Sequence, residues 1–151
     1  MRSRYLFSFI AFGVLIFLGL YVLVNPSYQK SIEAKYHYEM GDYKEAYALA
    51  NEAFAMDVYN RMASTIMAQS LTSLKYVAYI NQAKEFMAEI NEMAEGEIIS
   101  QAQRAKIKLM SEIVVDSYSK LAPSVITNRE LVEEAALYHK NFEKLLEKVT
   151  R

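Results

Sequence analysis

Besides its carboxylates, the chain offers two histidines and no cysteine for acid–base or metal chemistry. The missing thiols exclude disulfides, thiolate zinc sites and cysteine nucleophiles. His37 and His139 lie in different predicted helices, and neither forms an H-E-x-x-H zinc pattern. A lone histidine on a helix is usually a packing or surface residue, and we expect this role for both.

Other catalytic patterns are also missing from the sequence. Glu133 and Glu134 are neighbours, so on a helix they face different directions and cannot share a proton. Gly41 and Gly96 have no glycine neighbours, which excludes a glycine-rich phosphate loop, and no G-x-S-x-G elbow occurs. We therefore predict no catalytic residue, no metal site and no cofactor. An enzyme with an unrecognised site is the alternative.

Composition predicts an all-α protein. The 151 residues include only four glycines and two prolines, and no stretch alternates with the period of two that marks a strand. The formal net charge is −1, from 17 basic and 18 acidic residues, which gives no basic face for nucleic acid.

Residues 5–24 form an uncharged apolar segment and predict a transmembrane helix. Its 20 residues, at about 1.5 Å each, reach about 30 Å, the thickness of a hydrocarbon core. A cleaved signal peptide is the alternative. However, its apolar region would be longer than the usual range of about 7–15 residues, and no A-x-A-like cleavage site follows.

Basic residues predict the orientation of this anchor. Arg2 and Arg4 directly precede it, whereas Lys30 and Lys35 on the other side are mixed with acidic residues. The denser positive flank stays in the cytoplasm. We therefore predict a single-pass inner-membrane protein with a cytoplasmic tail of residues 1–4 and an extracytoplasmic, in bacteria periplasmic, domain of residues 25–151.

Start and stop signals divide the rest into about six helices. Asn25-Pro26 is a helix start, Gly41 a stop and Asp42 a second cap. Thr127 with Glu130 reads as a capping box that opens the last helix. The predicted helices cover residues 26–40, 42–56, 60–74, 77–94, 97–121 and 127–149.

The last predicted helix carries a regular apolar seam with a period near 3.5 residues. We expect this seam to pack within the chain, against the preceding helix through Ile98, Ala102, Ala105 and Leu109. A coiled-coil contact with a partner, or with a second copy in a homo-oligomer, is the alternative. The seam consists of Leu131, Ala135, Tyr138, Phe142, Leu145 and Val149.

Residues 34–60 resemble a tetratricopeptide repeat. Small residues, one aromatic residue and a Gly-Asp-Tyr turn occur at the family's spacing, at Ala34, Tyr38, Gly41, Asp42, Tyr43, Ala46 and Ala53. The sequence departs from the family pattern at Lys30, His37, Ala50 and Val58.

The resemblance weakens after this unit. A step of 34 residues brings Ala34 to Ala68 and Ala102, but Lys75 then replaces Gly41. The resemblance therefore implies a short helical-hairpin solenoid, in which residues 25–60 form the best repeat, residues 61–95 a degenerate repeat and residues 96–151 a divergent helical pair.

The resemblance also implies a partner-binding groove along the first helix of each repeat. Its expected residues are Tyr28, Ile32, Lys35, Tyr38, Glu39, Met62, Ile66, Gln69 and Thr72.

We therefore expect a non-catalytic, membrane-anchored interaction module. Its expected partners are the lipid bilayer and other membrane or envelope proteins. It would act as a scaffold or assembly factor of an envelope complex, for example a secretion system or flagellar motor. The alternative is a membrane-bound chaperone with an open, methionine-rich groove of Met62, Met67, Met87 and Met93.

Overall fold

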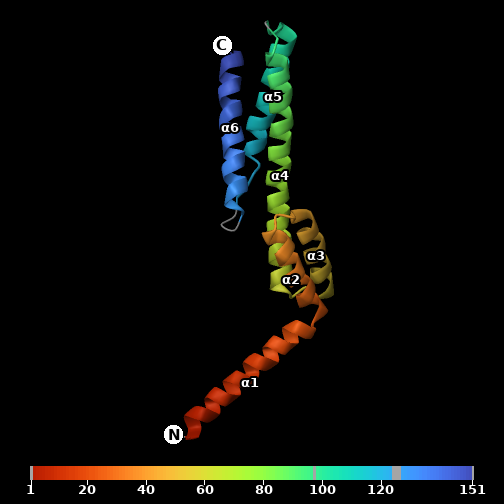
Figure 1. The fold of residues 1–151 in the computed structure, drawn as a ribbon, viewed down its shortest axis with the longest axis vertical. Coiled ribbons are helices and arrows are strands. Elements are labelled where there is room, and N and C mark those ends of the chain that lie inside the picture. The colour runs from red at the N-terminus through yellow and green to blue at the C-terminus, as the bar shows by residue number, and fades with distance from the viewer. Residues whose placement is uncertain (1, 97, 124–126, 151) are drawn as a thin grey trace. The chain divides into compact units, whose positions relative to one another are not determined.

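The computed structural model describes residues 2–96, 98–123 and 127–150, and these form six α-helices and no strand (Figure 1). The predicted all-α class is confirmed. The chain divides into two compact units, Met1–Ser70 and Leu71–Arg151. The helices are α1 (Arg2–Val24), α2 (Pro26–Glu39), α3 (Tyr43–Met56), α4 (Arg61–Ala94), α5 (Gln101–Tyr118) and α6 (Arg129–Thr150).

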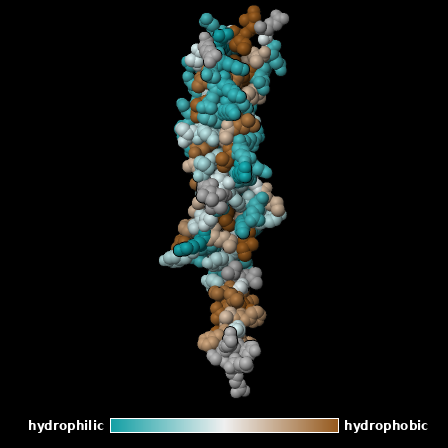
Figure 2. Space-filling view, turned by 90° about the vertical axis from the view of Figure 1, so that its left-hand side faces the viewer, coloured by the Kyte–Doolittle hydropathy of each residue, from teal (hydrophilic) through white to brown (hydrophobic). Residues whose placement is uncertain are grey.

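Helix α1 exposes apolar side chains in every direction. All residues from position 7 to position 21 are exposed, with Phe9 at 77 % and Phe17 at 71 %. Figure 2 shows this helix as a brown, hydrophobic surface. Within the described residues no helix meets, by itself, the length and hydropathy of a membrane span, although the bent pair Phe7–Tyr21 and Pro26–Glu39 meets them together.

The α2–α3 pair forms as the local signals predict. The Asn25 side chain accepts a hydrogen bond from the Ser27 amide, with Pro26 in the first turn of α2. Gly41 has a φ of 84°, a conformation that a side chain would strain, and it reverses the chain between the helices. The Asp42 carboxylate then accepts from the Glu45 amide and caps α3.

Small side chains let α2 and α3 approach closely. Ala34 on α2 and three alanines of α3 are fully buried. Ala34 and two of the α3 alanines, Ala46 and Ala50, form a cluster with Leu49 and with Ile66 of α4. The crossing predicted from the repeat is thus present around Ala34, but its expected equivalents Ala68 and Ala102 are exposed. The buried α3 alanines are Ala46, Ala50 and Ala53.

A buried polar network joins the ends of three helices. Asn60 is fully buried, and its amide nitrogen donates to the Ser27 hydroxyl at 2.8 Å and to the Ser31 hydroxyl at 2.7 Å. Its side-chain oxygen accepts from the Ala63 amide at 3.1 Å, which caps α4. The Ser27 hydroxyl in turn donates to the Ala53 carbonyl at 2.8 Å, near the end of α3.

Helix α4 is continuous from Arg61 to Ala94, so the predicted break between residues 74 and 77 was wrong. Lys75 can continue a helix where Gly41 had ended one. Ser73 and Tyr76, on either side of Lys75, are buried and lie on one face of α4. The predicted helical hairpin of residues 61–95 is therefore replaced by the single helix α4, and among the described residues five helices follow α1 instead of about six.

The C-terminal unit has a larger core, built from the second part of α4 together with α5 and α6. The predicted seam packs into this core: Ala135 and Phe142 are fully buried, and its other four residues pack against the cluster. The expected packing of the seam within the chain is confirmed. The buried core residues are Tyr76, Tyr79, Ile80, Ala83, Ile90, Ile107, Met110, Val114, Ala135 and Phe142.

The prediction of which face of α5 is buried was wrong. Leu109 is 57 % exposed and Ile98, before the helix, is 86 % exposed, while Ala102 and Ala105 are also exposed. The buried face is instead the one with Ile107, Met110, Ser111 and Val114.

The ends of α5 and α6 also differ from the prediction. A capping box of Ser100 and Gln103 opens α5, which ends at Tyr118 rather than near residue 121. The predicted start at Glu97 lies outside the described residues. Helix α6 begins at Arg129, and the Asn128 side chain accepts a hydrogen bond from the Glu130 amide in its first turn.

Replacing Asn60 by alanine tests the buried network. We expect Asn60→Ala to lower the free energy of unfolding of the N-terminal unit by about 2–3 kcal/mol, because the α4 cap and the donors to two buried hydroxyls are lost. Hydrogen exchange of the α2 and α3 amides measures the stability of this unit separately from that of the C-terminal unit. The exposed Asn51→Ala on α3 is the matched control. Equal exchange in both variants would contradict the role given to Asn60.

Candidate interaction surfaces

The α2 part of the predicted groove is mainly open. Ile32, Lys35 and Glu39 are exposed, and Lys35 pairs with Glu39 at 3.6 Å. Tyr28 and Tyr38 are half-buried. The Tyr38 ring packs against the core and meets the Tyr43 ring edge-on, with a centroid distance of 5.3 Å.

The α4 part of that groove is mainly filled. Ile66 is only 4 % exposed and belongs to the core of the N-terminal unit, so its prediction as a groove residue was wrong. Met62 packs on the same core and Gln69 is half-buried. Thr72 falls in the C-terminal unit, where it is half-buried.

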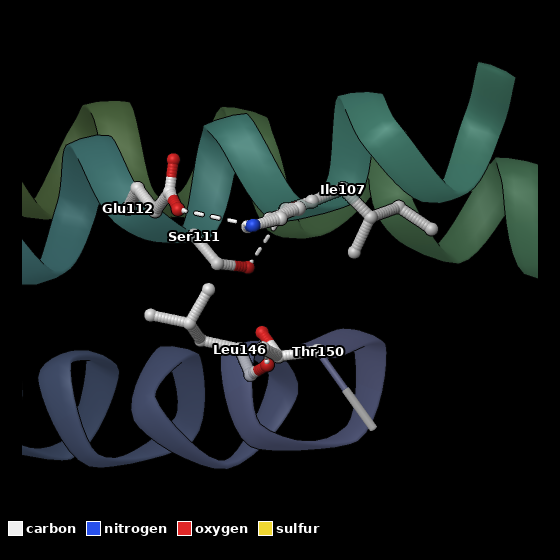
Figure 3. Close-up of polar contacts among 6 residues, drawn as sticks. Ile107, Ser111, Glu112, Leu146 and Thr150 are labelled. Atoms are coloured by element: carbon white, nitrogen blue, oxygen red, sulfur yellow. Dashed lines mark hydrogen bonds and ion pairs between the residues drawn. The ribbon is translucent and has the colours of Figure 1, made fainter. Parts of the chain in front are cut away.

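Sequence reasoning missed a wide groove between α5 and α6, with a volume of about 880 Å³. Figure 3 shows Ser111 of α5 pointing toward α6, on the side where Leu146 lies. Because the apolar seam of α6 is buried, the rotation of α6 about its own axis is fixed. One flank of the seam therefore lies beside α5 and lines the groove. Its lining residues are Lys108, Glu112, Val115, Lys140, Glu143, Lys144, Leu146, Glu147 and Thr150.

Charges of both signs surround a small apolar strip in this groove. Val115 and Leu146 are half-buried, and three lysines and three glutamates lie around them. Lys108 and Glu112 face each other at 3.8 Å along α5. An apolar strip with a mixed-charge rim suits an amphipathic protein segment, which needs apolar contact and several polar partners.

A second, smaller pocket of about 260 Å³ lies in the same unit. Six of its eight lining residues are apolar, and the other two are the cations Arg104 and Lys148. Its volume is below the range of about 300–1,000 Å³ typical of drug-sized ligands. The apolar residues are Ile90, Ala94, Ile99, Ile107, Leu145 and Val149.

Stacked aromatic rings surround His139. Its ring stacks on Tyr118 at a centroid distance of 4.2 Å, and Tyr118 lies 5.8 Å from Tyr79. The His139 Nδ1 atom is 3.6 Å from a carboxylate oxygen of Glu143. His139 therefore serves in helix packing, beside Glu143, which lines the α5–α6 groove.

Tyr79 combines burial with a hydroxyl that has no hydrogen-bond partner among the described residues. Burial, with smaller contributions from Tyr118 and Glu143, raises the pKa of Tyr79 to about 12.

Each of the two histidines lies near a carboxylate. His37 lies 3.5 Å from Asp42 and packs edge-on against Tyr36. Within the part of the chain that is described, no group of three or more His, Cys, Asp and Glu residues could hold a metal ion.

Comparison of the chain with protein-family models, curated proteins and solved structures finds no match. The surfaces above are therefore interpreted from their own geometry.

The raised pKa of Tyr79 predicts a loss of stability at high pH. Between about pH 10 and pH 12 the unfolded tyrosine ionises while the folded one keeps its proton, so stability falls as pH rises. The shift corresponds to about 2–3 kcal/mol for this buried group. We expect Tyr79→Phe to remove this part of the loss, measured by urea unfolding at pH 8 and pH 11.5. Tyr59→Phe, at a position 88 % exposed, is the control. An unchanged pH dependence in Tyr79→Phe would contradict the prediction.

Proposed function

We propose that this chain is a non-catalytic protein-interaction module that α1 fixes to a membrane. One observation carries the proposal: from Phe7 to Tyr21 no residue is charged and every residue is exposed. Burying one large apolar side chain is worth about 1.5–3 kcal/mol, so a row of exposed ones in water is very unfavourable. A lipid bilayer would cover all of them at once.

The sequence supports an extracytoplasmic position for the rest of the chain. Arg2 and Arg4 precede the apolar segment, and the first charges after it are of both signs. We therefore assign the inner membrane, with the N-terminus in the cytoplasm and α2–α6 in the periplasm or its equivalent.

The α2–α3 hairpin supports one tetratricopeptide-like repeat. Gly41 at the turn and the buried Ala34, Ala46 and Ala53 are the features that the family uses for close helix pairing. The continuous α4 removes the second hairpin. We therefore restrict the resemblance to the N-terminal unit and assign partner binding to the C-terminal unit.

The α5–α6 groove is the surface to which we assign a partner. It is the larger of the two hollows described above, and its mixed charges favour a protein segment from another membrane or envelope protein. A scaffold or assembly role in an envelope complex follows from this combination of anchor and groove. By contrast, Met62, Met67, Met87 and Met93 pack against the two cores, which does not favour a methionine-rich chaperone groove.

Membrane extraction tests the anchor. We expect the full chain to stay with membranes after alkaline carbonate washing and to be released only by detergent, because α1 would be held by the hydrocarbon core. A chain of residues 25–151 is the control and should appear in the soluble fraction. Release of the full chain by carbonate would contradict the anchor.

Site-specific photo-crosslinking in native membranes tests the partner surface. A crosslinker at Lys144, in the groove, should give a defined adduct with another protein, whereas one at the exposed Lys44 of α3 should not. The Lys144 adduct should also weaken in a Lys140→Glu variant, which changes the charge pattern of the groove. Equal adducts from both positions, or none, would exclude this groove as the partner surface.

A further inference from the structure

We infer that the loop between α3 and α4 is a second membrane contact, which inserts its apolar side chains at the lipid headgroup boundary. The inference rests on the proposed anchoring of α1. Three large apolar side chains in this short segment are exposed: Met56 by 54 %, Val58 by 60 % and Tyr59 by 88 %. A cluster of this kind, exposed beside a polar domain, commonly marks a protein or membrane contact.

The position of the loop favours the membrane, rather than another protein, as the surface that these side chains contact. The Asn60 amide holds the end of the loop on the Ser27 hydroxyl, at 2.8 Å, and the Ala53 carbonyl accepts from the same hydroxyl. Ser27 is only three residues after Val24, the last residue of α1. The loop therefore lies at the end of the α2–α3 hairpin from which the apolar helix departs.

The backbone continues from α1 into α2 without a flexible linker. The Asn25 amide donates to the Tyr21 carbonyl at 3.0 Å, and its side chain donates to the Tyr21 hydroxyl at 3.2 Å. The Tyr21 and Tyr28 rings meet edge-on with a centroid distance of 6.3 Å. If α1 spans the hydrocarbon, these tyrosines and Tyr59 lie at the interface, where amphipathic rings are favoured.

Hydrogen bonds hold the loop in a tight turn. The Asp57 carboxylate accepts from the Tyr59 amide at 2.9 Å, and the Asp57 carbonyl accepts from the Asn60 amide at 3.0 Å. The carboxylate is thus engaged within the turn. Arg61, which is exposed in the first turn of α4, adds a cation beside the apolar side chains that can face anionic headgroups.

Single tryptophans can measure this contact, because the chain has none. The full chain would carry Tyr59→Trp or, as the matched control, Tyr36→Trp. Tyr36 is also an exposed aromatic residue, at 58 %, but it lies nine residues beyond Ser27, about 13 Å further along α2. Both variants would be reconstituted in phosphatidylcholine–phosphatidylglycerol vesicles with and without bromine on the acyl chains.

The expected result is a shorter emission wavelength and strong bromine quenching for the Tyr59→Trp variant, but not for Tyr36→Trp. Equal quenching of both variants, or of neither, in protein that floats with the vesicles would overturn the loop contact and leave the α1 anchor intact. Failure of the full chain to float with the vesicles would overturn the anchor, and the loop contact with it.

Discussion

The buried side chain of Asn60 is the contact on which the N-terminal unit depends. Its amide donors and its oxygen join the beginning of α2 to the beginning of α4, and the Ser27 hydroxyl extends the network to the end of α3. An amide with no access to water is costly unless it is paired, and a fully paired one restricts its helices to a single arrangement. The same network holds the α3–α4 loop near the start of α2, where α1 ends, so one polar residue determines where the loop can act.

The two units solve helix packing with different side chains. In the N-terminal unit the buried contacts are mainly alanines and serines, which allow close approach but bury little apolar area for each residue. In the C-terminal unit tyrosines, isoleucines and Phe142 fill a larger core. The α2–α3 hairpin is not repeated within α4, because Lys75 and Tyr76 stand 34 residues after Gly41 and Asp42 and neither interrupts a helix. Tyr76 is instead buried in the core of the C-terminal unit.

Local sequence signals predicted much of the fold, whereas features that depend on contacts between residues distant in sequence could not be predicted. Asn25, Gly41 and Asp42 act on neighbouring backbone groups, so their roles could be read from a few residues. The face of α5 could not, because both Ala102–Ala105–Leu109 and Ile107–Met110–Val114 have helical spacing and only the position of α6 decides between them. The α5–α6 groove and the Asn60 network were missed for the same reason, since each depends on residues distant in sequence.

The groove residues limit what kind of partner can be recognised. With three lysines and three glutamates around Val115 and Leu146, the net charge of the groove is zero, so long-range attraction toward a uniformly charged surface is weak. Discrimination must then come from matching individual charges along a segment whose apolar face covers the strip. If α1 anchors the chain as proposed, the tether suits such a groove, because confinement of both proteins to one surface raises their effective concentration without any additional contact energy. Modest affinity at the groove would then be sufficient for a stable complex.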